Sequence, residues 1–176
     1  MSDNPMKKNV AVMGVFLSVA LILSYVESLV PFYFGVPGMK LGLTNVMVVL
    51  LLYYRSPKEA FTISLLRILL SSLLFGSLFS FCFSLAGGLF SFFVMWIVFR
   101  LFRLHPVTVS ILGGVSHNVG QLVAAMLLVK NYAAAFYFPV LFFFGIVTGG
   151  LIGIMAAECG KRLPFLQNGS KHKNCS

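Results

Sequence analysis

The stretch VAVMGVFLSVALILSYVESLV, residues 10–30, decides the fold class of this chain. Residues 10–26 contain no charged side chain, and about 20 apolar residues are enough for a helix to cross the hydrocarbon core of a bilayer. Lys7 and Lys8 precede the run as in a signal peptide, but the run is too long for one and lacks a small-residue cleavage site. We therefore predict that residues 10–30 form a transmembrane helix.

Composition extends this prediction to the whole chain. Of its 176 residues 59% are apolar and 10% are charged, whereas about a quarter of the residues of a soluble domain are charged. We predict an all-α, polytopic membrane protein with a single six-helix domain over residues 1–162 and a polar cytoplasmic tail over 163–176. The predicted helices cover residues 10–30, 41–54, 59–75, 81–101, 106–129 and 134–157.

The second of these helices is short for a span, so it is tilted, buried within the protein or continued by an ordered loop. The preceding segment PFYFGVPGMK, residues 31–40, combines prolines, glycines and aromatic residues, which is typical of an interfacial loop or a re-entrant turn.

Basic residues predict the orientation in the cell membrane. With the amino terminus inside, ten of them face the cytoplasm and only Lys40 and Lys130 face outward, which places both termini in the cytoplasm. They occur as separated pairs rather than as a patch, so the net charge of +9 does not indicate a nucleic-acid partner. The ten are Lys7, Lys8, Arg55, Lys58, Arg100, Arg103, Lys161, Arg162, Lys171 and Lys173.

Enzymatic signatures are missing from the sequence. It has one aspartate, Asp3, and no DDxxD pair, HExxH motif, phosphate loop or nucleophile elbow. The three cysteines, Cys82, Cys159 and Cys175, show no metal-ligand or disulfide spacing. We therefore expect neither an enzyme nor a bound cofactor or metal ion.

The thirteenth basic residue, Arg67, lies within a predicted helix. At 1.5 Å per residue it is about 13 Å beyond Lys58, near the bilayer midplane, where an arginine is costly without partners. Ser64 and Ser71 share its helix face, which should point into the bundle. Two interpretations remain: Arg67 contacts a ligand or gates a pathway, or it forms a structural ion pair, with Glu27 as the candidate partner.

Other polar residues fall at a similar depth. Asn45 lies roughly 15 Å from Arg55, and His117 about 16 Å from Pro106, with Asn118 beside it and Gln121 one turn further on. Together with Thr148 they predict a polar chamber in the outer half of the bundle, with Glu27 and Lys40 at its mouth. Asn118 and Gln121 are equally compatible with hydrogen bonds that only pack helices together.

Two further patterns have simple interpretations. Glu158 lies within a turn of Lys161 and Arg162, which predicts an interfacial salt bridge. Ala20, Ser24 and Ser28 recur every four residues, and such small residues let helices approach closely, either within the bundle or against a membrane partner.

Two segments carry a resemblance to a known family: PGMKLGLTNVMVVLLLY (residues 37–53) and GGVSHNVGQLVAA (residues 113–125). With the Arg67 helix and the Gly87/Gly88 helix, they resemble the Gx transporter family, long labelled heptaprenyl diphosphate synthase component I. That family is similar to the six-helix S components of energy-coupling-factor (ECF) transporters, which capture vitamins and related compounds. The resemblance implies an ECF S-component-like fold, with a characteristic set at Lys40, Asn45, His117, Asn118 and Gln121.

The leading functional hypothesis is a non-enzymatic membrane component that binds a small anionic or amphipathic solute in the outer chamber. Lys40 and Arg67 would supply positive charge, and Asn45, His117, Asn118 and Gln121 would supply hydrogen bonds. Active transport would need a coupling membrane subunit and two ATPases. Two alternatives stay open: an accessory membrane subunit of polyprenyl diphosphate or quinone metabolism that binds an isoprenoid, and a scaffold subunit of a membrane redox complex.

Overall fold

The computed structural model describes residues 5–29, 42–130 and 132–162, with side chains from Val10 onward. Within these ranges the chain forms six α-helices and one 3-10 helix and no strand, which confirms the predicted all-α fold class. The elements are α1 (Pro5–Leu29), α2 (Asn45–Tyr54), α3 (Pro57–Phe75), α4 (Leu78–Phe102), α5 (Pro106–Val129), η1 (Tyr132–Tyr137) and α6 (Phe138–Arg162).

The helix α2 is shorter than the predicted residues 41–54. Gly42 has a φ of +80°, a left-handed conformation that glycine adopts without strain and a helix excludes. A turn follows, closed by a 2.8 Å hydrogen bond from the amide of Asn45 to the carbonyl of Gly42, and α2 then begins at Asn45. Its side chains are buried all round, from Val46 to Leu52 with the exception of Met47. Of the options for a short helix, burial within the protein is the one observed for α2.

Serine and proline set the start of α3. The hydroxyl of Ser56 accepts a hydrogen bond from the amide of Glu59 at 3.2 Å, and Pro57 occupies the first helical position, where no amide hydrogen is needed. Ser77 caps α4 in the same way through the amide of Ser80. The predicted start of the last helix at residue 134 falls in η1, and α6 itself begins at Phe138 with Pro139 in its first turn.

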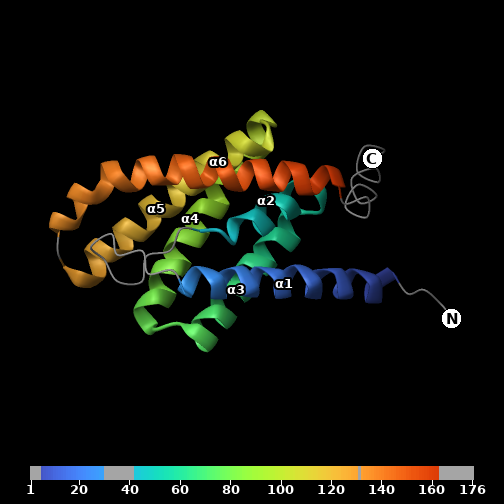
Figure 1. Ribbon diagram of the computed structural model, residues 1–176, viewed down its shortest axis with the longest axis horizontal. Coiled ribbons are helices and arrows are strands. Elements are labelled where there is room, and N and C mark those ends of the chain that lie inside the picture. The colour runs from blue at the N-terminus through green and yellow to red at the C-terminus, as the bar shows by residue number, and fades with distance from the viewer. Residues whose placement is uncertain (1–4, 30–41, 131, 163–176) are drawn as a thin grey trace.

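The helix α5 lies at the centre of the bundle, with α4 on one side and α6 on the other. Helix α1 packs mainly against α3. The start of α1, the α2–α3 turn and the end of α6 lie at the right end of Figure 1, and the η1 connection lies at the opposite end.

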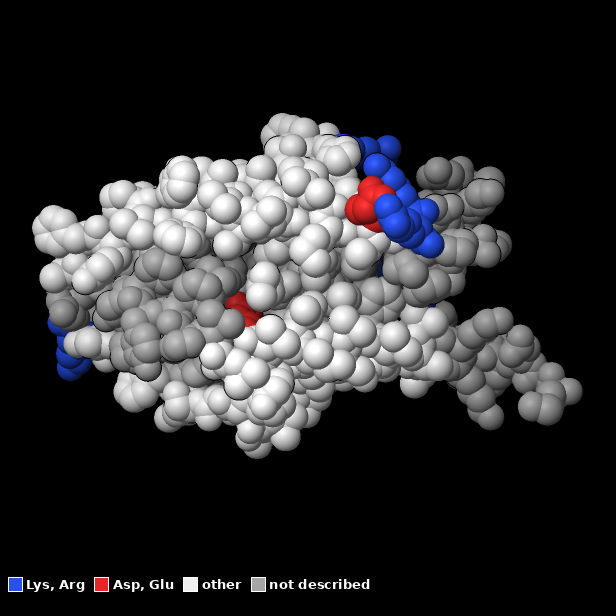
Figure 2. All heavy atoms as spheres, viewed as in Figure 1, with Lys and Arg blue, Asp and Glu red and all other residues white. Residues whose placement is uncertain are grey.

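Four stretches, in α1, α4, α5 and η1–α6, are long and apolar enough to cross a membrane. Many large apolar side chains point outward from them, among them Val15, Leu101 and Phe143, as expected for a surface solvated by lipid. In Figure 2 uncharged atoms cover most of the described face, and acidic and basic side chains lie side by side near the end of α6. The described chain therefore has the build of a helical membrane bundle.

The charged side chains at the end of α6 confirm the salt bridge predicted for Glu158. Its carboxylate oxygens lie 2.9 Å from Arg162 Nε and 3.8 Å from Lys161 Nζ.

The small residues of α1 lie on two different faces of the helix. Ala20 and Ser24 are buried, which supports packing within the bundle, whereas Gly14, Ser18 and Ser28 lie on the exposed side.

Candidate ligand-binding site in the bundle core

Two polar side chains of α5 face α4 across a glycine. His117 and Gln121 are one turn apart, and their exposed fractions are 2% and 0%. A Cβ atom at Gly87 of α4 would lie 2.8 Å from Gln121 Cγ and 3.1 Å from His117 Cε1. Glycine at position 87 thus gives α4 and α5 the space for two polar side chains at their contact.

The start of α2 lies close to His117. A Cβ atom at Gly42 would lie 3.3 Å from Asn45 Nδ2 and 3.4 Å from His117 Cδ2. The amide of Asn45 donates to Ser91 Oγ of α4 at 3.5 Å, and that hydroxyl donates to the carbonyl of Gly113 on α5 at 2.8 Å. Asn45 and His117, predicted at one depth from separate helices, therefore do lie together.

Helices α1 and α3 add a pair of opposite charges. Glu27 and Arg67 are 4% and 3% exposed. The Glu27 carboxylate accepts a hydrogen bond from the backbone amide of Gly42 and interacts electrostatically with the Arg67 guanidinium. Ser64 and Ser71 are buried with Arg67, which confirms that this face of α3 points inward.

We call Glu27, Asn45, Arg67, His117 and Gln121 the polar cluster. The sequence predicts Glu27 at the mouth of the chamber, beside Lys40. Glu27 lies near the end of α1, where it is buried and its carboxylate accepts a hydrogen bond from the amide of Gly42. Lys40 lies outside the described residues.

Several buried polar atoms around the cluster have no hydrogen-bond partner among the described residues. Burying such an atom without a partner costs free energy, so a region with several of them is a candidate for binding a polar ligand. In the cluster and beside it these atoms are Arg67 Nη2, both side-chain polar atoms of Gln121, Ser24 Oγ, Thr44 Oγ1 and Ser84 Oγ.

Sequence reasoning missed Ser24, Thr44 and Ser84 as candidates. On α4 a signal exists, because Ser80, Ser84, Gly87, Gly88 and Ser91 recur at helical spacing and all five are buried. This stripe of small and polar residues marks the buried face of α4, which meets α5 at Gly87 and Ser91 and α3 at Gly88.

Asn118 lies elsewhere. Its amide donates to the carbonyl of Leu141 on α6 at 2.8 Å, and a Cβ atom at Gly145 would lie 3.1 Å from it. Thr148 is half-buried, and its hydroxyl donates to the carbonyl of Phe144 within α6 at 2.8 Å. The structure thus supports the packing interpretation for Asn118 and brings Gln121 into the polar cluster.

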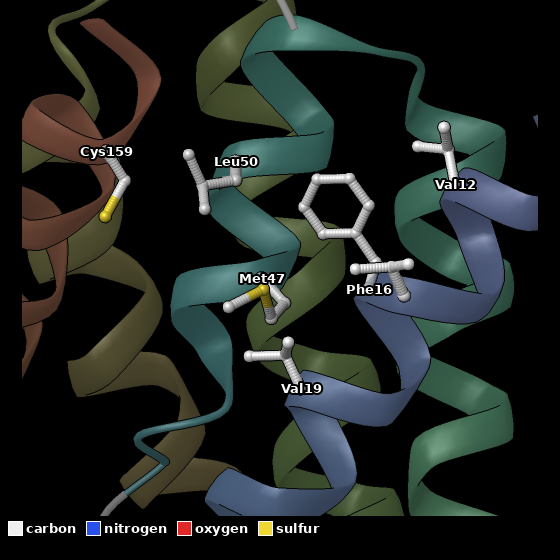
Figure 3. Close-up of a pocket in the computed structure, with 7 residues that line it drawn as sticks. Val12, Phe16, Val19, Met47, Leu50 and Cys159 are labelled. Atoms are coloured by element: carbon white, nitrogen blue, oxygen red, sulfur yellow. The ribbon is translucent and has the colours of Figure 1, made fainter. Parts of the chain in front are cut away.

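A separate groove of about 560 Å³ lies between α1, α2 and α6 (Figure 3). Its lining is apolar apart from the thiol of Cys159, and Val12, Phe16 and Val19 of α1 face Met47 and Leu50 of α2. Among the described residues no group of three or more His, Cys, Asp or Glu side chains could hold a metal ion. The polar cluster is therefore the candidate site, and it is suited to binding through hydrogen bonds and charge.

Fold and site together define a helical membrane bundle with a buried polar cluster at its core. Residues 16–159 match the family described as heptaprenyl diphosphate synthase component I. Because this match covers most of the chain, the protein belongs to that family. No curated protein matches the chain.

Proposed function

We propose that the protein is a non-enzymatic membrane component that binds a small anionic or amphipathic solute in the polar cluster, as part of a transport system. The observation that carries the proposal is Gln121, which is fully buried while both polar atoms of its amide lack a hydrogen bond to any described residue. Neither lipid nor a packed apolar core would supply those bonds. A polar ligand in the cluster would supply them.

Each residue of the cluster has a role in this proposal. Arg67 presents Nη2, a buried donor without a partner among the described residues, to an anionic group of the ligand, because a guanidinium binds oxygen anions through directional hydrogen bonds. Asn45, His117 and Gln121 orient the uncharged part of the ligand through hydrogen bonds. Lys40 remains a proposed second source of positive charge.

Transport requires energy that this chain shows no motif to supply. The resemblance to ECF S components suggests a coupling membrane subunit and two ATPases as partners. It also suggests an outward-facing chamber with both termini in the cytoplasm. A single cysteine introduced by Lys130→Cys should then react with an impermeant thiol reagent only from outside the cell, and labelling only from the cytoplasm would contradict this orientation.

A second candidate function follows from the family's description, which names a component of a synthase and implies a partner subunit. In that case the chain is an accessory membrane subunit of isoprenoid metabolism, and the apolar groove of Figure 3 is the place for a hydrocarbon chain. Stable co-purification with a soluble prenyl synthase would favour this candidate over transport. A scaffold in a membrane redox complex remains a third proposal, in which the polar cluster only packs helices.

Arg67→Met tests the leading proposal, because methionine keeps most of the bulk and removes the charge. We expect small molecules that co-purify with the wild type to be lost from the variant. Their re-addition should stabilise it far less, since a lost charge-assisted hydrogen bond is worth about 1.5 to 3 kcal/mol, roughly tenfold to a hundredfold in affinity.

The measurements are mass spectrometry of extracted small molecules and thermal unfolding with and without them. Arg162→Met is the matched control, because Arg162 is exposed at the end of α6. A structural ion pair with Glu27 would instead lower the stability of the ligand-free variant. If the ligand stabilised Arg67→Met as much as the wild type, Arg67 would not be part of the binding site.

A further inference from the structure

The apolar groove between α1, α2 and α6 opens on the outer surface of the bundle (Figure 3). From Val12 to Val19 it follows α1 for about 10 Å at 1.5 Å per residue, less than the roughly 15 Å that one leaflet contributes to the hydrocarbon core. Val15 and Cys159, which line it, are both exposed. A hydrocarbon chain from one leaflet of a bilayer can therefore enter the groove from the side.

Basic residues continue this apolar lining at the end of the bundle where α1 begins and α6 ends (Figure 1). Arg162 comes three residues after Cys159, so it lies on the same face of α6, one turn nearer the helix end. Its side chain is 78% exposed, and its Nε lies 2.9 Å from the carboxylate of Glu158, the residue next to Cys159. Since a guanidinium has five N–H donors, Arg162 has the capacity to bind a second anion. In the sequence of α1, two lysines precede Val12 at positions 7 and 8.

We infer that the groove binds an anionic phospholipid of the surrounding bilayer, with a hydrocarbon chain along its apolar wall and the phosphate at Arg162. Pockets between membrane helices that are basic at the membrane surface suit anionic headgroups. A helix of a partner protein would use the apolar wall alone, and a phosphate ion would use the basic end alone. A phospholipid uses both. This site is separate from the polar cluster and does not depend on the proposed function.

A prenyl diphosphate also combines a hydrocarbon chain with phosphate. The bilayer, however, offers phospholipid as the solvent of the bundle, at a far higher local concentration than any single metabolite. By mass action, a groove that is open to the bilayer is filled by the lipid in excess unless another ligand binds much more tightly. The phospholipid is therefore the occupant that we assign, and the diphosphate is the comparison.

Native mass spectrometry of the purified full-length chain in detergent tests the inference, because it counts bound lipids one by one. The probes are phosphatidylglycerol and phosphatidylcholine with identical acyl chains, glycerol 3-phosphate and farnesyl diphosphate. We expect the first phosphatidylglycerol to bind the wild type about tenfold or more tightly than the first phosphatidylcholine, the effect of one charge-assisted hydrogen bond. Glycerol 3-phosphate, which lacks the chains, should not bind detectably.

Two variants break the same salt bridge with opposite changes of charge. Arg162→Met removes the cation and should abolish the preference for phosphatidylglycerol, whereas Glu158→Gln removes the carboxylate beside it and should increase that preference. A purely structural role of the salt bridge would shift both variants in the same direction. Arg100→Met is the matched control, since Arg100 is an exposed arginine near the end of α4, a helix outside the described lining. It should leave the preference unchanged.

Cys159→Trp tests the apolar wall, because an indole at this position fills part of the groove. Binding of both phospholipids should fall about tenfold, since less apolar surface of the chain is removed from contact with detergent. Met155→Trp is the matched control, at an exposed position of α6 outside the described lining. Because both positions are exposed, both variants should fold.

Equal binding of the two phospholipids by the wild type, shifts of the same sign in Arg162→Met and Glu158→Gln, or unchanged lipid binding in Cys159→Trp would overturn the inference. Tighter binding of farnesyl diphosphate than of phosphatidylglycerol would assign the groove to an isoprenoid instead. A dimer that Cys159→Trp dissociates would assign it to a second copy of the chain. The two sites are also separable, because Arg67→Met should keep the lipid preference and Arg162→Met should keep the solute of the polar cluster.

Discussion

The helices α1 and α5 show how differently two apolar segments of one chain can be used. The mean hydropathy of the most apolar window is 2.1 in α1 and 1.4 in α5, yet 22% of that window is buried in α1 and 56% in α5. The more hydrophobic helix lies at the edge, and the less hydrophobic one occupies the centre. In a membrane, apolar side chains are solvated by lipid, whereas polar side chains and glycines gain most from contacts with other helices.

The difference is clearest at the glycines. A Cβ atom at Gly14 of α1 would meet nothing within 4 Å, whereas one at Gly149 would lie 2.6 Å from the carbonyl oxygen of Ser110 on α5. Glycine at position 149 therefore permits direct contact between the backbones of α5 and α6, and Gly14 has no such role. Between α1 and α5, small and polar residues rather than hydropathy distinguish the central helix from the peripheral one.

The largest effect is expected from Gly149→Leu. The added side chain would force α5 and α6 apart, and overpacking of this kind costs about 3 kcal/mol. Gly14→Leu is the matched control and should change the free energy of unfolding by no more than about 0.5 kcal/mol. Unfolding in detergent measures both, and equal losses would show that the contrast between α1 and α5 is wrong.

A smaller loss is expected from Asn118→Leu, which removes the hydrogen bond between α5 and α6. Bonds between membrane helices contribute about 0.6 to 2 kcal/mol, so unfolding should become easier by that amount. Ligand binding should stay unchanged, because Asn118 faces α6 and not the polar cluster. A loss of ligand affinity without a loss of stability would show that Asn118 is part of the binding site.

Gln121→Leu should stabilise the ligand-free protein, whereas Asn118→Leu should destabilise it. Its amide is buried without a hydrogen bond to the residues that the structure describes, so its removal should stabilise the ligand-free protein by about 1 kcal/mol while ligand binding is lost. Asn45→Leu provides the comparison, since the Asn45 amide does bond to Ser91 and its removal should destabilise. A destabilised, ligand-competent Gln121→Leu variant would argue for packing alone.

The smallest effect is expected at the end of α6. Glu158→Gln removes the salt bridges to Lys161 and Arg162, but exposed ion pairs contribute little to stability. We expect no measurable change in Tm at physiological salt. A clear decrease in Tm that vanishes at high salt would show that these charges stabilise the end of the bundle more than their exposure suggests.

The depth of some residues of the candidate site could be predicted from the sequence by counting residues along each helix. Depth along a helix follows from counting residues, so Asn45 and His117 could be placed in one layer before any contact was known. The inward face of α3 followed from the spacing of Ser64, Arg67 and Ser71. Rotation about the axis of α5 was not predictable, so Asn118 and Gln121 received the same prediction and proved to face different helices.

The sequence by itself determined the helical membrane class, the number of α-helices in the described chain and the polar residues that must be sheltered. These follow from run length, hydropathy and the cost of charge in lipid, which are properties of each segment alone. Only the tertiary structure decided that α2 starts at Asn45, that Glu27 is buried beside Arg67 and that α5 is central. Those outcomes depend on which helix faces meet. Close contacts at glycines such as Gly87 and Gly149 fix that arrangement. The sequence of one helix does not show which face of another helix it will contact.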